Sequence, residues 1–95
     1  NDELGALRDL LRQSPEVIRK GGRLVVISYH SLEDRLVKNF INSGNTDGEV
    51  TTDIYGNVQG LSFKAITRKP LVPDAEEVER NPRSRSAKMR IAERL

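Results

Sequence analysis

A short apolar run near the start of the chain, Leu24-Val25-Val26-Ile27, constrains the fold more than any other feature. Its residues do not alternate with polar ones, and three of the four are β-branched. Such a run is typical of a parallel strand that is covered on both faces. Two glycines precede it and a helical pattern follows it, so the sequence predicts a central strand over Arg23 to Tyr29 that leads directly into a helix.

The residues before this strand predict two helices. The apolar residues of the first fall on one side at the 3.6-residue period: Leu4, Leu7, Leu10 and Leu11. Asp2 is expected to cap this helix. Ser14-Pro15-Glu16 predicts a second helical start, because proline is favoured at the first helical position. Gly21-Gly22 is expected to end that second helix.

A further helix is expected immediately after the strand. Ser31 is a favourable N-cap, and Asp34 at the third helical position gives an approximate capping box. The apolar stripe that follows consists of Leu32, Leu36, Val37, Phe40 and Ile41. The helix is expected to run to about Asn42.

The second half of the chain alternates between loops and short elements. Residues 43–60 predict a variable loop, with a possible short hairpin about Gly56. A strand is expected over Leu61 to Arg68, followed by a short helix capped by Asp74 with Glu77 completing a capping box, and ended by Asn81-Pro82. From Ala87 onward, apolar and basic residues alternate as in a strand. This order predicts the closing part of an α/β sheet.

Length and composition bound the possible functions. Ninety-five residues suffice for one small domain. The chain has no cysteine and one histidine, which excludes a disulfide framework and a conventional zinc site. The longest apolar run is far short of the roughly 20 residues that span a bilayer. We therefore expect a soluble cytoplasmic protein that uses neither a metal nor a membrane.

Positive charge is concentrated at the carboxyl end. The whole chain carries +2, whereas residues 80–95 contain six basic residues and one acidic residue, a local balance of +5. Such a cluster would attract phosphate groups and release counterions from nucleic acid. The alternative is a solvated strand face whose basic residues deter edge aggregation.

The best local position for a site is the junction of the central strand and the following helix. Ligand crevices in α/β sheets form at the carboxyl ends of strands, and His30 and Ser31 lie at such an end. Backbone N–H groups at the helix start could bind an anion or a base edge. Alternatively, Ser31 only caps the helix and Arg35 pairs with a neighbouring carboxylate. The spacing supports neither a nucleophilic triad nor a phosphate-binding glycine loop.

A second candidate site is a compact polar run near the carboxyl end. It offers an amide, two guanidiniums and two hydroxyls from Asn81, Arg83, Ser84, Arg85 and Ser86. These groups suit contacts to phosphates and base edges of RNA, because arginine binds phosphate through two parallel hydrogen bonds. The alternative is a polar turn into the last strand.

Two segments resemble motifs of one protein family, both in their amino acids and in their order along the chain: residues 27–35, ISYHSLEDR, and residues 81–88, NPRSRSAK. The chain is similar to the ribosomal small-subunit RNA methyltransferase H family, also called MraW. The resemblance covers nearly the whole chain except residues 43–60. It implies an S-adenosylmethionine-dependent enzyme that methylates N4 of a cytosine in the decoding region of 16S rRNA.

The resemblance also implies a Rossmann-like methyltransferase fold. In that fold the strand at Arg23 to Tyr29 would be the fifth of seven. The strand within Leu61 to Arg68 would be the sixth, and the strand from Ala87 the seventh, inserted antiparallel between the other two. The chain would then be the carboxyl-terminal segment of the catalytic domain.

The family's motifs that bind the methyl donor and grip the target amine have no counterpart in these residues. We therefore expect the isolated chain neither to bind S-adenosylmethionine nor to catalyse transfer, and its missing partner would be the upstream half of the domain. No catalytic residue can be assigned. Two other classes remain open: a non-enzymatic RNA-binding or interaction fragment that uses the basic terminus, and a scaffold that binds no RNA. Whether 95 residues form a whole gene product is also left open.

Overall fold

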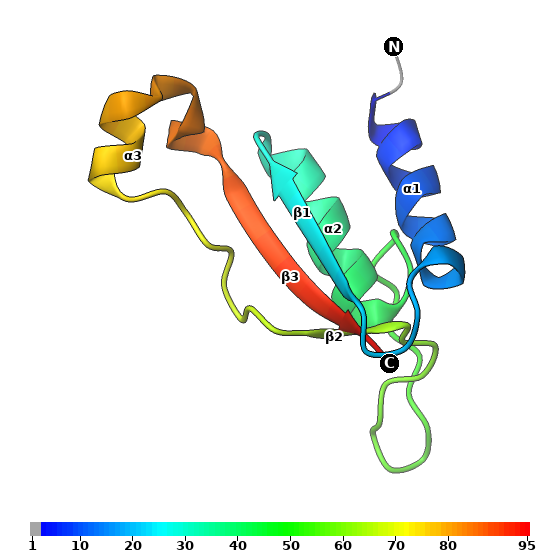
Figure 1. The fold of residues 1–95 in the computed structure, drawn as a ribbon. Coiled ribbons are helices and arrows are strands. Elements are labelled where there is room, and N and C mark those ends of the chain that lie inside the picture. The colour runs from blue at the N-terminus through cyan, green and yellow to red at the C-terminus, as the bar shows by residue number, and fades with distance from the viewer. Residues whose placement is uncertain (1–2) are drawn as a thin grey trace.

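The computed structural model describes residues 3–95 and contains a small sheet with helices on one face (Figure 1). The elements in chain order are α1 (Glu3–Val17), β1 (Arg23–Ser28), α2 (Ser31–Ser43), β2 (Phe63–Ala65), α3 (Ala75–Arg80), the 3-10 helix η1 (Pro82–Ser86) and β3 (Lys88–Arg94). In Figure 1, α2 lies behind β1 and β3, and α3 lies beyond the far end of β3. The predicted α/β organisation is therefore present.

The three strands are ordered β1-β3-β2, and β3 is antiparallel to both neighbours. The last strand in sequence thus lies between the other two, the arrangement that the family resemblance implies. Within the described chain, however, β1 is an edge strand, and the prediction of a central strand is wrong for these residues. The reason is that β3 pairs with one edge of β1, whereas no described residue pairs with the other.

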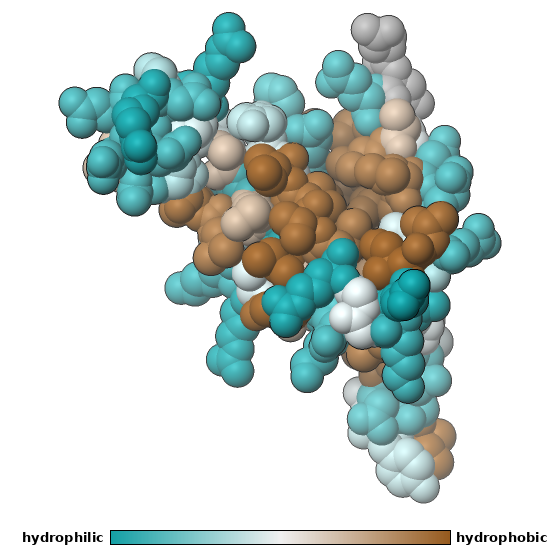
Figure 2. All heavy atoms as spheres, viewed as in Figure 1, coloured by the Kyte–Doolittle hydropathy of each residue, from teal (hydrophilic) through white to brown (hydrophobic). Residues whose placement is uncertain are grey.

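Burial along β1 alternates, although its sequence does not. Leu24, Val26 and Ser28 turn toward α2, whereas Val25 and Ile27 are 53% and 54% exposed on the opposite face. Met89 and Ile91 of β3 pair with Ile27 and Val25 and share this outer face. Figure 2 shows brown, apolar residues at the centre of this view. The expected coverage of β1 on both faces is therefore not found among residues 3–95, because helices pack on one face only.

The core lies between α2 and the inner face of the sheet. Its buried residues are Leu11, Leu36, Val37, Phe40, Ile41, Phe63 and Ala92. Most of the expected apolar stripe of α2 is buried there, but Leu32 is 57% exposed. The rings of Phe40 and Phe63 pack at a centroid distance of 5.8 Å and a tilt of 53°. This tilted contact joins α2 to β2, the shortest strand.

Helix α1 is continuous, so the prediction of a second helical start at Ser14-Pro15-Glu16 is wrong. Pro15 lies in the last turn and has no N–H to donate to the Leu11 carbonyl. The Ser14 hydroxyl donates to that same oxygen at 2.7 Å and replaces the missing bond. The helix therefore passes through a residue that normally interrupts it. The expected cap, Asp2, lies outside the described residues.

The start of α2 differs from the prediction by one residue. His30 is the N-cap and Ser31 is the first helical residue. Glu33, not Asp34, occupies the third position, and its Oε1 accepts from the backbone N–H groups of Tyr29 and His30 at 3.3 and 3.2 Å. Because Glu33 stabilises the helix entry, Asp34 is free for a different contact.

In the second half of the chain, the predicted hairpin about Gly56 is present, but the strand predicted over Leu61 to Arg68 is shorter than expected. Thr52 and Val58 form an isolated antiparallel bridge, and Gly56 takes a positive φ of 85° at the turn between them. Strand β2 covers three residues rather than eight, because the N–H groups of Ile66 and Thr67 both donate to the carbonyl of Ile91, which interrupts the regular ladder.

The helix predicted after β2 is present as α3. The Asp74 carboxylate accepts from the backbone N–H of Glu77 at 2.7 Å, as expected of a cap. Asn81 is the C-cap, so the helix ends at Asn81-Pro82 as predicted. The side chain of Glu77 pairs with Arg80 at 3.6 Å.

Gly44 provides a test of how the loop is fixed against α2. It has a φ of 86°, and a Cβ at this position would clash with the carbonyl oxygen of Gly60. We expect Gly44→Ala to lower the free energy of unfolding by more than the roughly 1 to 2 kcal/mol that a left-handed conformation alone costs. Urea unfolding measures this change.

Gly21 is the matched control. Its φ is 85°, but a Cβ there would contact nothing within 4 Å. Gly21→Ala should therefore show only the conformational cost. Equal losses for the two variants would contradict a steric role for the contact between Gly44 and Gly60.

Candidate functional site

Residues 27–35 (the first motif) and residues 81–88 (the second motif), which carry the family resemblance, meet at one end of the sheet. Because β1 and β3 are antiparallel and Ser28 pairs with Lys88, the end of β1 lies beside the start of β3. The first motif continues from β1 into α2, and the second forms η1 just before β3. Two segments separated by 45 residues of sequence therefore lie at the same edge of the molecule.

A cleft of about 360 Å³ opens at this end on the outer side of the sheet. Tyr29 at the end of β1 and Met89 of β3 line it, together with Asn81 and Ser84 of the second motif. The segment after β2 closes the other side, where Leu71 exchanges two backbone hydrogen bonds of 2.8 Å with Met89. The cleft has largely apolar walls with a few polar groups, as is usual for ligand sites.

The residues predicted at the strand-helix junction do not all reach this cleft. His30 and Ser31 are exposed, and His30 lines a smaller hollow of about 140 Å³ beside α1. Arg35 is also exposed and lines another hollow with Arg8 of α1. Arg35 forms no ion pair within 4.0 Å among residues 3–95, so the expected pairing with Glu33 or Asp34 is not found. Tyr29, which was not predicted as a site residue, is the member of this motif that lines the cleft.

The second motif contains both structural and outward-facing groups. Ser84 is buried, and its hydroxyl donates to the Asn81 carbonyl at 2.7 Å. This bond closes the turn of η1. The side chains of Arg83, Arg85 and Ser86 are exposed around it. The turn thus presents two guanidiniums from a fixed backbone.

The basic carboxyl end separates into two groups. Arg80, Arg90 and Arg94 are held by protein partners: Arg80 pairs with Glu77, and Arg94 donates to the carbonyls of Pro15, Ser62 and Leu95. Arg83, Arg85 and Lys88 form no ion pair within 4.0 Å in the described part of the chain. About half of the six basic residues between positions 80 and 95 are therefore available to a ligand. Neither a phosphate-binding cluster nor a solvated strand face describes all six.

Arg90 forms a buried ion pair with Asp34. Its Nε and Nη2 donate to the two carboxylate oxygens of Asp34 at 2.7 and 3.0 Å. Both side chains are only 10% exposed. The bidentate bond with Arg90 lowers the pKa of Asp34 from its ordinary value of 3.8, more than burial raises it. The members of this pair are 56 positions apart, so no local sequence pattern indicates their contact.

Two general features of residues 3–95 concern membranes and metal ions. No helix of this range is long and apolar enough to cross a bilayer. Within the same range, no group of three or more histidine, cysteine, aspartate or glutamate side chains is arranged to hold a metal ion.

Comparison with known proteins identifies the family. A sequence model of the MraW methylase family matches residues 1–95. The chain belongs to the MraW methylase family. The chain is 59% identical over its full length to ribosomal RNA small subunit methyltransferase H of Parabacteroides distasonis. It is 54% and 57% identical, over 99% of its length, to proteins of the same name from Bacteroides thetaiotaomicron and Amoebophilus asiaticus. It spans only about 31%, 31% and 30% of these three MraW relatives.

The pair of Asp34 and Arg90 should dominate the stability of this MraW segment. Replacing Arg90 by Leu leaves a buried carboxylate without its partner, which costs about 3 to 5 kcal/mol. Urea unfolding at neutral pH measures the loss. Asp9→Asn is the control, because Asp9 and Arg12 form an exposed pair at 4.0 Å and such pairs contribute little.

The same pair predicts a pH dependence. Because the pKa of Asp34 is lower in the folded state, the unfolded chain takes up the proton first as the pH falls. The stabilisation is present above about pH 5 and is lost as the pH falls through 3.8 and below. The stability difference between the wild type and Asp34→Asn should shrink over this window. A constant difference would show that the charge of Asp34 is not what stabilises the fold.

Proposed function

We propose that this chain is the carboxyl-terminal part of the catalytic domain of a cytoplasmic, S-adenosylmethionine-dependent methyltransferase that modifies N4 of a cytosine in the decoding region of 16S rRNA. The family match over residues 1–95 carries the proposal. The names of the relatives supply the substrate class, ribosomal RNA of the small subunit. In this proposal β1, β2 and β3 are the fifth, sixth and seventh strands of the complete sheet, and residues 43–60 are a variable loop.

The upstream part of the enzyme is the proposed partner of the exposed sheet face. Val25, Ile27 and Tyr29 are each more than half exposed, although they belong to or directly follow the most apolar strand. Burial of such side chains contributes about 1.5 to 3 kcal/mol each. The free edge of β1 lies beside this face and can accept a further strand. An apolar face and an unpaired edge are expected of a partial sheet whose remaining strands and covering helices come from another part of the same domain.

Donor binding is assigned to the remaining two-thirds of the enzyme, because the glycines of this segment do not fit a nucleotide-binding turn. Gly21 and Gly22 precede β1 instead of following it. Their backbone groups are already used: the Gly21 N–H donates to the Arg94 carbonyl, and the Gly22 carbonyl accepts from the Arg94 N–H, both at 2.8 Å. They close the sheet and are not available to a phosphate or ribose.

The segment's own contribution would be to bind and position RNA. Arg83 and Arg85 project from the fixed turn of η1 and suit backbone phosphates, while Ser86 adds a hydroxyl and Asn81 an amide. Ser84 would act by holding that turn. His30, Ser31 and Arg35 would contact RNA on the helix side of the junction, nearer the target base. Placing the reacting amine is a large part of catalysis by group transfer.

The test compares the isolated chain with a complete enzyme. A chimera in which residues 1–95 replace the matching third of the Parabacteroides distasonis relative should methylate small-subunit rRNA at cytosine N4, as measured by mass spectrometry of digested RNA. The isolated chain should not, and calorimetry should detect no micromolar binding of S-adenosylmethionine. An inactive but folded chimera that still binds RNA would favour a non-enzymatic RNA-binding segment.

The role of η1 is tested by Arg83→Ala combined with Arg85→Ala in the chimera. If each guanidinium contacts one phosphate, the slope of log affinity against log salt should fall by about 2, and binding at low salt should weaken. Arg19→Ala with Lys20→Ala is the matched control, because these exposed cations lie at the opposite end of β1. An unchanged slope would remove η1 from the RNA interface.

A further inference from the structure

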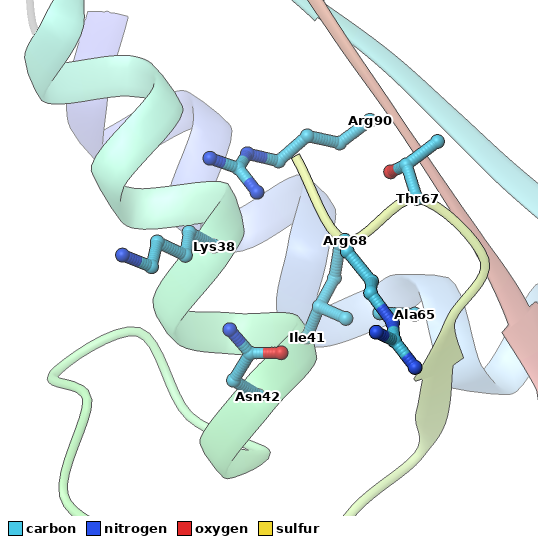
Figure 3. Close-up of a pocket in the computed structure, with 7 residues that line it drawn as sticks. All are labelled: Lys38, Ile41, Asn42, Ala65, Thr67, Arg68 and Arg90. Carbon is cyan, nitrogen blue, oxygen red and sulfur yellow. The ribbon is translucent and has the colours of Figure 1, made fainter. Parts of the chain in front are cut away.

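A second basic site lies on the helix side of the sheet, away from the cleft at η1. It is a pocket of about 230 Å³ between α2, the segment after β2 and β3. Figure 3 shows Lys38 and Asn42 on α2, Thr67 and Arg68 on the segment after β2, and Arg90 reaching from β3 toward α2. None of the first four is part of the motifs that carry the family resemblance.

The lining of this pocket is strongly positive. It includes three cations and no carboxylate. The carboxylate of Asp34 is already engaged by Arg90 through two hydrogen bonds. Lys38 and Arg68 are exposed and form no ion pair within 4.0 Å inside residues 3–95. Their charges are therefore available to an anion, and the buried pair keeps the guanidinium of Arg90 in place at the pocket wall.

Neutral groups complete the set of donors. The Thr67 hydroxyl oxygen accepts from the Ile91 backbone N–H at 3.2 Å, so its hydrogen can turn into the pocket. The Asn42 side chain offers amide hydrogens beside it. Cations together with a hydroxyl and an amide are the donors that proteins use for phosphate oxygens. The volume is below the roughly 300 to 1,000 Å³ of pockets for drug-sized ligands, which suits a single anionic group better than a whole nucleotide.

We propose that Lys38, Asn42, Thr67 and Arg68, supported by Arg90, form a binding site for a backbone phosphate of the RNA substrate. The inference rests on the proposed function and extends it to a surface outside the two motifs. Its place in the fold fits this role, because Thr67 and Arg68 follow the carboxyl end of β2, and β2 runs parallel to β1. From there the chain pairs with β3 at Leu71 and continues to η1. RNA bound at η1 therefore has a second anchoring point on the other side of the sheet.

The test uses the same chimera and measures the affinity for a small-subunit rRNA fragment at several salt concentrations. Lys38→Gln combined with Arg68→Gln should weaken binding about 10-fold at low salt and reduce the salt slope by about 1. The two single variants should each lose part of the affinity. Arg19→Gln with Lys20→Gln removes the same charge elsewhere and should leave the slope unchanged. Thermal unfolding of each variant checks that the fold is intact.

Several outcomes would overturn the inference. If the wild-type chimera binds RNA and the Lys38 and Arg68 variants have the same salt slope, the pocket is not an RNA phosphate site. The proposed function would still stand. Loss of RNA binding and methylation by the wild-type chimera would overturn both. Inorganic phosphate is the probe for a free anion: at equal ionic strength it should compete with RNA better than chloride does in the wild type, and this advantage should be lost in the Lys38 and Arg68 variants. Strong competition by phosphate together with an unchanged RNA slope would assign the pocket to a free anion instead.

Discussion

The bidentate pair of Asp34 and Arg90 is the interaction on which the arrangement of this segment depends. It joins the first turn of α2 to the middle of β3 at 2.7 and 3.0 Å and is nearly excluded from water. Two buried charges are costly unless they are fully hydrogen-bonded to each other, so the two elements have one favoured position. That position sets one wall of the basic pocket, while the pairing of Ser28 with Lys88 brings the strand-helix junction beside η1.

The sheet itself explains why the segment has two unlike surfaces. The inner face of β1 and β3 packs on α2, whereas the outer face exposes Val25 and Ile27. In an independent small domain such a face would be largely polar, because an exposed apolar strand invites association. Its apolar character is consistent with the 31% coverage of the relatives. The polar residues of the two motifs and of the basic pocket lie instead at the strand ends and along α2.

The sequence indicated the two motifs of the candidate site, but it did not indicate which of their side chains are held by the protein and which are exposed. The strand-helix junction and the Asn81 to Ser86 run were identified because the chemistry of each is local. The sequence assigned Arg90 and Arg94 to a positive cluster, although both are held by carbonyl or carboxylate groups far away in the chain. Tyr29 was overlooked as a cleft residue because nothing in its neighbours indicates which side of the sheet is open.

By itself the sequence determined the family, most of the element order and the end of α3, because motifs, caps and periodicity depend on residues within a few positions of one another. Even there, Pro15 stayed inside α1 because the Ser14 hydroxyl took over the bond to Leu11. Only the tertiary structure decided that β3 lies between β1 and β2 and that Asp34 meets Arg90. It also brought Lys38 and Arg68 to one pocket. These relations join residues 24 or more positions apart, whose pairing depends on how the helix and the strands pack and not on any local pattern.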